Sequence, residues 1–151
     1  MTTSSTRCVM PTSAKTQIWL VDTSVAVALL TTDHIAHDAV FAAIAGRRLG
    51  LAGHAAYETY SVLTRLPPPA RRTPGAVGRL LAANFPHSRF LGPGRAAELL
   101  VELSDSGIAG GSVYDALVAA VAIEHALPLV SRDRRALVTY RDLGADVEFL
   151  S

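Results

Sequence analysis

Residues 18–24 are Ile18-Trp19-Leu20-Val21-Asp22-Thr23-Ser24: four apolar side chains, an acid and two hydroxyl residues. An uninterrupted apolar run of this length is typical of a strand buried on both faces, as in a parallel sheet covered by helices. Asp22 then lies just beyond the carboxyl end of that strand, where open α/β sheets carry their ligand sites. Because an unpaired buried carboxylate is strongly disfavoured, we expect Asp22 to have partners elsewhere in the chain.

The length of 151 residues, half of them hydrophobic, is enough for one domain with a substantial core. We expect residues 17–151 to form this domain and the polar residues 1–16 to form a flexible N-terminal tail without the apolar segment of a signal peptide. No apolar run reaches the roughly eighteen residues that a membrane span needs. The single cysteine, Cys8, excludes an internal disulfide, so we expect a cytoplasmic protein that makes no membrane contact.

Charge is unevenly distributed along the chain. Residues 1–95 carry ten basic and four acidic side chains, whereas residues 96–151 carry four basic and nine acidic ones. Nearly all the basic residues are arginines, which suit bidentate contact with phosphate. A GC-rich genome also favours arginine codons, but codon bias does not explain the clustering. The asymmetry therefore favours a polyanionic partner.

Strand patterns alternate with helix patterns from residue 18 onwards. Short apolar runs predict strands at residues 18–21, 49–52, 88–91, 127–130 and 147–150. Helical periodicity, caps and prolines predict helices at residues 23–30, 33–46, 53–65, 73–83, 95–103, 112–122 and 134–140. We expect the helix at residues 33–46 to begin at Asp33 and to bury Ile35, Ala39, Val40, Ala43 and Ile44. The alternation indicates an α/β fold, a three-layer α/β/α domain with a mostly parallel sheet of four to five strands.

Four acids stand at equivalent places in this predicted topology, namely Asp22, Glu58, Asp115 and Asp133. Each follows a strand or lies near the start of a helix, so all four can meet at one edge of the sheet. Each also has a purely structural interpretation: Asp115 as a capping or first-turn acid, Asp133 as a turn residue, Glu58 as a solvent-facing helical residue. Taken together, four acids at four equivalent positions favour a common site.

A cluster of like charges raises its own pKa values unless a cation neutralises it. Hard divalent cations prefer oxygen ligands, and Mg²⁺ in particular binds through a few carboxylates and retains water. The four acids therefore predict a site for such an ion.

The acids lie in four short motifs, which are Val21-Asp22-Thr23-Ser24, Ala56-Tyr57-Glu58-Thr59, Tyr114-Asp115-Ala116-Leu117-Val118-Ala119-Ala120 and Ser131-Arg132-Asp133-Arg134-Arg135. In residue type, order and approximate spacing, the set resembles PIN-domain ribonucleases, and most closely the VapC toxins of prokaryotic toxin–antitoxin pairs. The resemblance covers about residues 18–150 and implies that residues 17–151 are a single PIN-like nuclease domain.

The resemblance implies a metal-dependent endoribonuclease. Asp22, Asp115 and Asp133 would hold Mg²⁺ or Mn²⁺, and Glu58 would orient or deprotonate the attacking water. It further implies hydrogen-bonding support around the site from Ser24, Ser112 and Ser131. Flanking cations are needed to bring RNA to an acidic pocket, and the candidates are Arg71, Arg72, Arg132 and Arg134. The family also implies a homodimer and a cognate VapB-type antitoxin.

Other phosphate-handling classes fit less well. A haloacid-dehalogenase-type phosphatase needs a second Asp where this chain has Ser24, and a response-regulator receiver needs a late lysine, whereas the only lysine is Lys15. His34 and His37 are three residues apart but lack an evident third metal ligand. Two alternatives stay open: a PIN-type DNA nuclease, and a PIN-like module that binds RNA or protein without cleaving it.

Overall fold

The computed structural model describes residues 16–151, so all but the last residue of the predicted tail lies outside the described residues. The strands are β1 (Ile18–Val21), β2 (Arg48–Leu51), β3 (Leu129–Ser131) and β4 (Val147–Phe149). The helices are α1 (Thr23–Leu30), α2 (His37–Ile44), α3 (His54–Arg65), α4 (Pro74–Asn84), α5 (Pro93–Ser106), α6 (Ser112–Glu124) and α7 (Arg134–Asp142). In the described part of the chain, no helix is long and apolar enough to cross a membrane.

The four strands form one sheet in the order β2-β1-β3-β4, and every pairing is parallel. β1 lies at the centre, which explains its uninterrupted apolar sequence. Val21 pairs with Val130, so the next residue of each strand, Asp22 and Ser131, also lie side by side. The sheet register thus joins two segments that are more than a hundred residues apart in the sequence.

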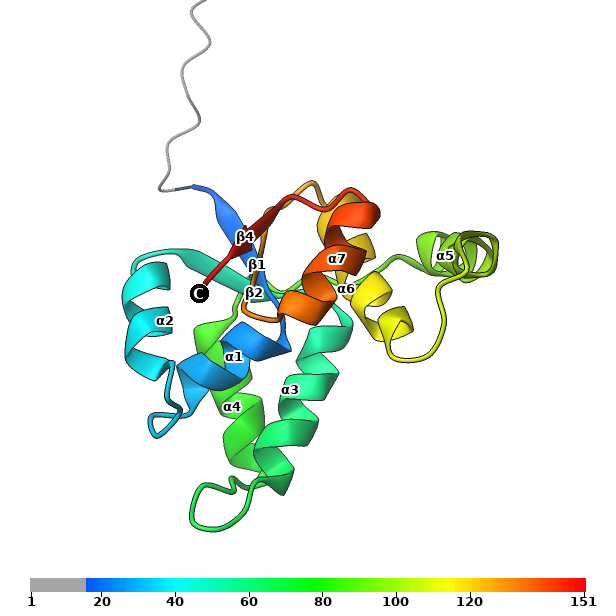
Figure 1. The fold of residues 1–151 in the computed structure, drawn as a ribbon. Coiled ribbons are helices and arrows are strands. Elements are labelled where there is room, and N and C mark those ends of the chain that lie inside the picture. The colour runs from blue at the N-terminus through cyan, green and yellow to red at the C-terminus, as the bar shows by residue number, and fades with distance from the viewer. Residues whose placement is uncertain (1–15) are drawn as a thin grey trace, which may run out of the picture.

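Helices cover both faces of the sheet, which confirms the three-layer α/β/α architecture (Figure 1). On one face, Val21 and Val130 pack with side chains of α1, α2, α3 and α4. On the other face, Leu20 and Leu129 pack with the start of α3 and with α6 and α7. α5 lies outside these layers and packs on α6 through a smaller cluster that includes Leu99 and Leu103.

The predicted strand at residues 88–91 is wrong, since this segment makes only an isolated bridge between Arg89 and Ala52. The backbone N–H of Leu51 donates to the Ser88 hydroxyl instead of to a backbone carbonyl, which interrupts the ladder. The segment still lies against β2. A Cβ on Gly50 would approach the His87 carbonyl oxygen to 2.1 Å, so only glycine permits this contact.

The predicted start of the helix at residues 33–46 is also wrong, because α2 begins at His37 with Ala36 as its cap. Turns centred on His34 precede it, and Ile35 is fully exposed, while Ala39 and Ala43 face solvent as well. Val40 and Ile44 are buried, as predicted. The His37 ring contacts the Ala28 carbonyl oxygen at 3.0 Å. The other predicted helices agree with the structure to within a few residues at each end.

Candidate active site

Asp22 is only 3% exposed and is surrounded by hydrogen-bond donors. Its Oδ1 accepts from the Ser24 hydroxyl and from the Val25 backbone N–H, which makes Asp22 the cap of α1. Its Oδ2 accepts from the hydroxyls of Ser131 and Tyr140, the latter at 3.0 Å. Burial raises the pKa of Asp22, while the bonds from Ser131, Ser24 and Tyr140 oppose that rise.

The two serines also fix the segment that follows β3. The Ser24 hydroxyl accepts from the Arg132 backbone N–H at 2.9 Å, and the Ser131 hydroxyl accepts from the Asp133 N–H at 3.1 Å. Each serine therefore connects Asp22 to the backbone beside Asp133. This network holds the two carboxylates in a fixed relation, as expected of residues that support a binding site.

Tyr140 was not anticipated from the sequence as a site residue. It is buried on α7, and both burial and the nearby Asp22 charge raise the pKa of its phenol, so its hydroxyl stays protonated as a donor. The signal that could have identified it is the spacing from Asp133, since residues seven apart lie on one face of a helix. Nothing in the local sequence pairs it with Asp22, which is 118 residues away.

Glu58 lies in the second turn of α3 and is held by two partners. Its Oε2 accepts from the Thr23 hydroxyl at 3.1 Å, and its Oε1 lies 3.1 Å from His54 Nε2. The His54 ring in turn stacks on Tyr114, with 4.9 Å between the ring centroids. The side chain of Glu58 is thus oriented by residues of α1, α3 and α6, and His54 is a second contact that sequence reasoning missed.

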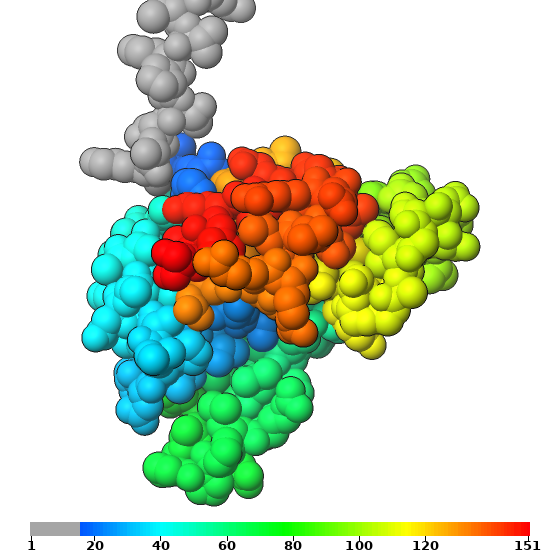
Figure 2. Space-filling model, viewed as in Figure 1, coloured from blue at the N-terminus to red at the C-terminus, as the bar shows by residue number. Residues whose placement is uncertain are grey.

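The structure brings all four acids to the carboxyl edge of the sheet. Asp115 lies in the first turn of α6, and Asp133 caps α7 by accepting from the N–H groups of Arg135 and Ala136. Burial, together with the smaller effect of the charges of Asp133, Glu58 and Asp22, raises the pKa of Asp115 to about 6. Atoms of α1 (blue) are visible between those of α7 (orange) and α3 (green) in Figure 2.

The remaining predicted residues lie at varying distances from these acids. Ser112 begins α6 and makes no side-chain hydrogen bond to another residue of the range 16–151. Arg71 and Arg72 follow the far end of α3, where they donate to the carbonyls of Leu66 and Leu30 (Figure 1). The structure therefore does not bring these two arginines to the acids.

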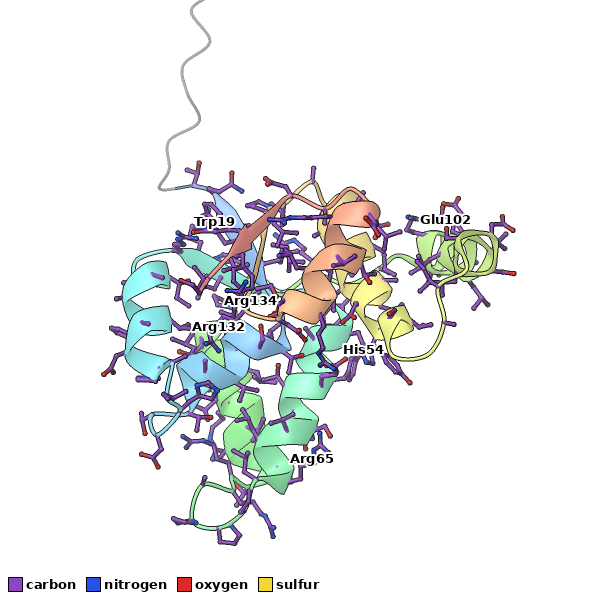
Figure 3. All side chains as sticks on the ribbon, viewed as in Figure 1. Trp19, His54, Arg65, Glu102, Arg132 and Arg134 are labelled. Carbon is purple, nitrogen blue, oxygen red and sulfur yellow. The ribbon has the colours of Figure 1, made fainter. Side chains whose placement is uncertain are left out.

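The arginines after β3 lie beside the acids. Arg132 follows Ser131 directly, and Arg134 begins α7 with its guanidinium over the Phe149 ring (Figure 3). Arg135 is a closer electrostatic neighbour, because its charge lowers the pKa of Asp115. These residues supply positive charge at the rim of the acidic site.

The donor set fits a hard divalent cation. Within residues 16–151, no three His, Cys, Asp or Glu side chains form a ready-made metal cage. Hydroxyl and N–H groups donate to carboxylate oxygens of Asp22 and Asp133. The ligand atoms that the four acids offer to a metal are all carboxylate oxygens, which suit Mg²⁺ or Mn²⁺. Besides burial, the negative charges of Asp133, Glu58 and Asp22 raise the pKa of Asp115, and a bound cation would offset that repulsion.

The raised pKa of Asp115 predicts a pH-dependent stability in the presence of a chelator. The pKa of Asp115 is 3.8 in the unfolded chain and about 6 in the folded chain. Between these two pH values the folded chain binds more protons at Asp115 than the unfolded chain does, so the free energy of unfolding falls as pH rises. Asp115→Asn should make this slope shallower, leaving the part due to Asp22, and stabilise the protein by about 1–2 kcal/mol at pH 7, allowing for solvent screening. Urea unfolding at a series of pH values measures it. Asp105→Asn, an exposed change on α5, is the control, and an equal slope in wild type and Asp115→Asn would contradict the prediction.

Comparison with known proteins gives consistent matches. The sequence model of the PIN domain matches residues 19–142. The ribonuclease VapC27 of Mycobacterium tuberculosis is 48% identical over 127 residues, which cover 84% of this chain and 93% of that protein.

Solved structures match over most of the chain. The crystal structure of Mycobacterium tuberculosis VapC20, described as a sarcin-ricin loop cleaving toxin, has a TM-score of 0.61 at 18% identity and covers 80% of this chain and 93% of its own. VapBC2 from Rickettsia felis, bound to a DNA fragment from its promoter, has a TM-score of 0.63 at 14% identity. This match covers 89% of the present chain and 100% of the Rickettsia felis chain. At these identities the structural likeness supports the fold alone.

Proposed function

The chain belongs to the PIN-domain family and, within it, to the VapC ribonucleases, and from this premise we propose how its acids cleave RNA. It is a VapC-type ribonuclease, the toxin of a toxin–antitoxin pair. We assign the phosphodiester hydrolysis to the site formed by Asp22, Glu58, Asp115 and Asp133. The observation that carries this assignment is the hydrogen-bond network in which Ser24 and Ser131 donate to Asp22 and accept from the backbone beside Asp133. Glu58 and Asp115 face the same edge, where the charges of Asp133, Glu58 and Asp22 add to the effect of burial on Asp115.

Asp22, Asp115 and Asp133 would hold Mg²⁺ or Mn²⁺ in this proposal. The ion, when bound, lowers the pKa of water and offsets charge that develops on the phosphate. Glu58 orients or deprotonates the attacking water, and Thr23 and His54 keep its carboxylate in position. Ser24, Ser131 and Tyr140 align Asp22 and favour its ionised form by donating hydrogen bonds to it, against the effect of burial. Ser112, at the start of α6, is close in sequence to Asp115 and is proposed to support it once substrate is bound.

Arginines around the acidic site would attract the RNA backbone and partly cancel its repulsion by the acids. Arg132, Arg134 and Arg135 are the better placed group, since they flank Asp133. Arg71 and Arg72 would contact only RNA that extends past the far end of α3. Removing an arginine beside Asp133 should therefore lower the cleavage rate more than removing Arg71 or Arg72, because the rate depends on how the phosphate is held at the acids.

The activity test uses purified chain freed of any antitoxin. We expect cleavage of unpaired RNA only when Mg²⁺ or Mn²⁺ is present, and complete loss on addition of EDTA. A DNA strand of the same sequence is the matched substrate. Preferential cleavage of DNA would favour the PIN-type DNA nuclease, and RNA binding without cleavage under all metal conditions would favour the non-catalytic module.

We also propose a cognate VapB-type antitoxin and a homodimer. The support for the antitoxin is the Rickettsia felis complex, whose fold this chain shares. The apolar residues in and beside α3 and α4 are weak support for the dimer, because Leu63 is buried in this chain's own core and Leu66, Leu80 and Leu81, partly buried, pack against that core. Co-expression with the neighbouring reading frame, followed by light scattering, would test both assemblies.

A further inference from the structure

Aromatic rings gather on the surface beside Glu58, and we call His54, Tyr57, Phe90 and Tyr114 the aromatic shelf. Tyr57, Tyr114 and Phe90 are 66%, 52% and 49% exposed. Tyr57 meets Phe90 edge-on with 6.1 Å between centroids, and His54 lies nearly parallel to Tyr114 at 4.9 Å. The rings come from α3, α6 and the segment before α5, so the fold assembles them from separate parts of the sequence.

The shelf does not serve the core. None of its four rings belongs to the hydrophobic clusters formed by residues 16–151. Large aromatic surfaces left in water are unfavourable and, when they gather at one place, mark a binding surface. The exposed rings of the aromatic shelf therefore indicate a surface that binds another molecule.

A groove connects the shelf to the proposed catalytic residue. One pocket of about 670 Å³ is lined by Tyr57 and Tyr114 together with Glu58 and Arg65. A second pocket of about 360 Å³ extends past Phe90, and both pockets share His54 and Tyr57. Figure 3 shows His54 toward one end of α3 and Arg65 toward the other. A molecule in the first pocket thus contacts a wall that carries both Glu58 and the guanidinium of Arg65.

We propose that the aromatic shelf binds unpaired bases of the RNA next to the cleaved bond, a substrate preference that rests on the proposed ribonuclease function. Every base has a π-face that stacks on aromatic side chains, and proteins that bind single strands combine such rings with positive charge along the backbone. Arg65 supplies that charge at the open end of the groove. Bases inside a duplex are already stacked on each other and cannot enter, so the shelf selects single-stranded segments and loops.

His54 has two roles in this arrangement, because it contacts Glu58 and stacks on Tyr114. A base that packs on the shelf would also contact His54, the residue that orients the Glu58 carboxylate. Substrate binding and alignment of Glu58 are therefore connected through one ring.

The test measures binding of an unstructured oligouridine RNA and of a hairpin duplex by the folded chain in EDTA, so that no cleavage occurs. Tyr57→Ala and Tyr114→Ala should each weaken oligouridine binding by about tenfold. Tyr57→Phe and Tyr114→Phe, which keep the ring, should bind as the wild type does. Duplex binding should be the same in all variants, and Phe41→Ala, which removes an exposed ring on α2, is the matched control.

Equal oligouridine affinity in wild type, Tyr57→Ala and Tyr114→Ala would overturn the proposal. So would a loss of antitoxin binding in these variants with RNA affinity unchanged, since the shelf would then be a protein interface. Thermal melting confirms that each variant folds. The ribonuclease assignment fails separately, if wild-type chain with Mg²⁺ or Mn²⁺ leaves RNA intact, because the binding measurements use no metal.

Discussion

Glu58→Gln is expected to cleave RNA about a thousandfold more slowly than the wild type under saturating divalent metal. Glutamine preserves the length of the side chain and can accept the Thr23 hydrogen bond, but it has neither the negative charge nor the basicity of glutamate. Because a general base acts in the transition state, kcat should fall while RNA affinity changes little. Single-turnover cleavage and equilibrium binding of the same RNA measure the two quantities separately.

Glu98→Gln is the matched control, since it removes the same charge from the exposed surface of α5. It should cleave at the wild-type rate. Near wild-type cleavage by Glu58→Gln would mean that the bonds from Thr23 and His54 serve only to stabilise the start of α3. A large loss of RNA affinity, with kcat unchanged, would make Glu58 a binding residue.

The central strand and the meeting of the acids follow from simple features of the sequence. An apolar run ending in Asp22 predicts a buried parallel strand, and parallel strands bring their carboxyl ends to one edge. Asp115 and Asp133 follow from the same rule, because both stand at helix starts on that edge. Here topology alone determines position, so no side-chain detail is needed.

The errors arise where side chains replace backbone interactions. Residues 88–91 have the composition of a strand, but the Ser88 hydroxyl takes the N–H that a backbone carbonyl would accept. Ile35 is apolar yet fully exposed, because the His34 ring accepts from the Ala36 backbone N–H and α2 begins only at His37. Tyr140 and His54 escaped notice for the same kind of reason, since their contacts with Asp22 and Glu58 depend on packing between distant elements.

The position of Asp22 shows why an acidic site can survive in a folded chain. Its charge is costly to bury, but three hydroxyls and one backbone N–H point at it. The N-termini of α1 and α7 lie beside the acids and favour negative charge through the helix dipole. The fold thus tolerates the cluster without metal, while a cation would relieve what repulsion is left.

Asp22→Asn is expected to abolish the stabilisation by Mg²⁺ or Mn²⁺ and to lower cleavage by at least about a thousandfold. The variant should fold, since the asparagine oxygen can accept from Ser24 and its amide can donate to the hydroxyl of Ser131 or Tyr140. Without metal it should be at least as stable as the wild type, because a buried charge is gone. Thermal melting with and without the metal, beside cleavage assays, measures both effects.

Asp38→Asn provides the control for that experiment, because Asp38 is an exposed acid in the first turn of α2, away from the cluster. It should keep the full response to metal and the full activity. If Asp22→Asn also kept the metal response, Asp22 would be only the cap of α1, and the ion would have to be held by Asp115 and Asp133 without it. If the response vanished while cleavage persisted, the stabilising ion and the catalytic one would be different ions, and the single-site proposal would be wrong.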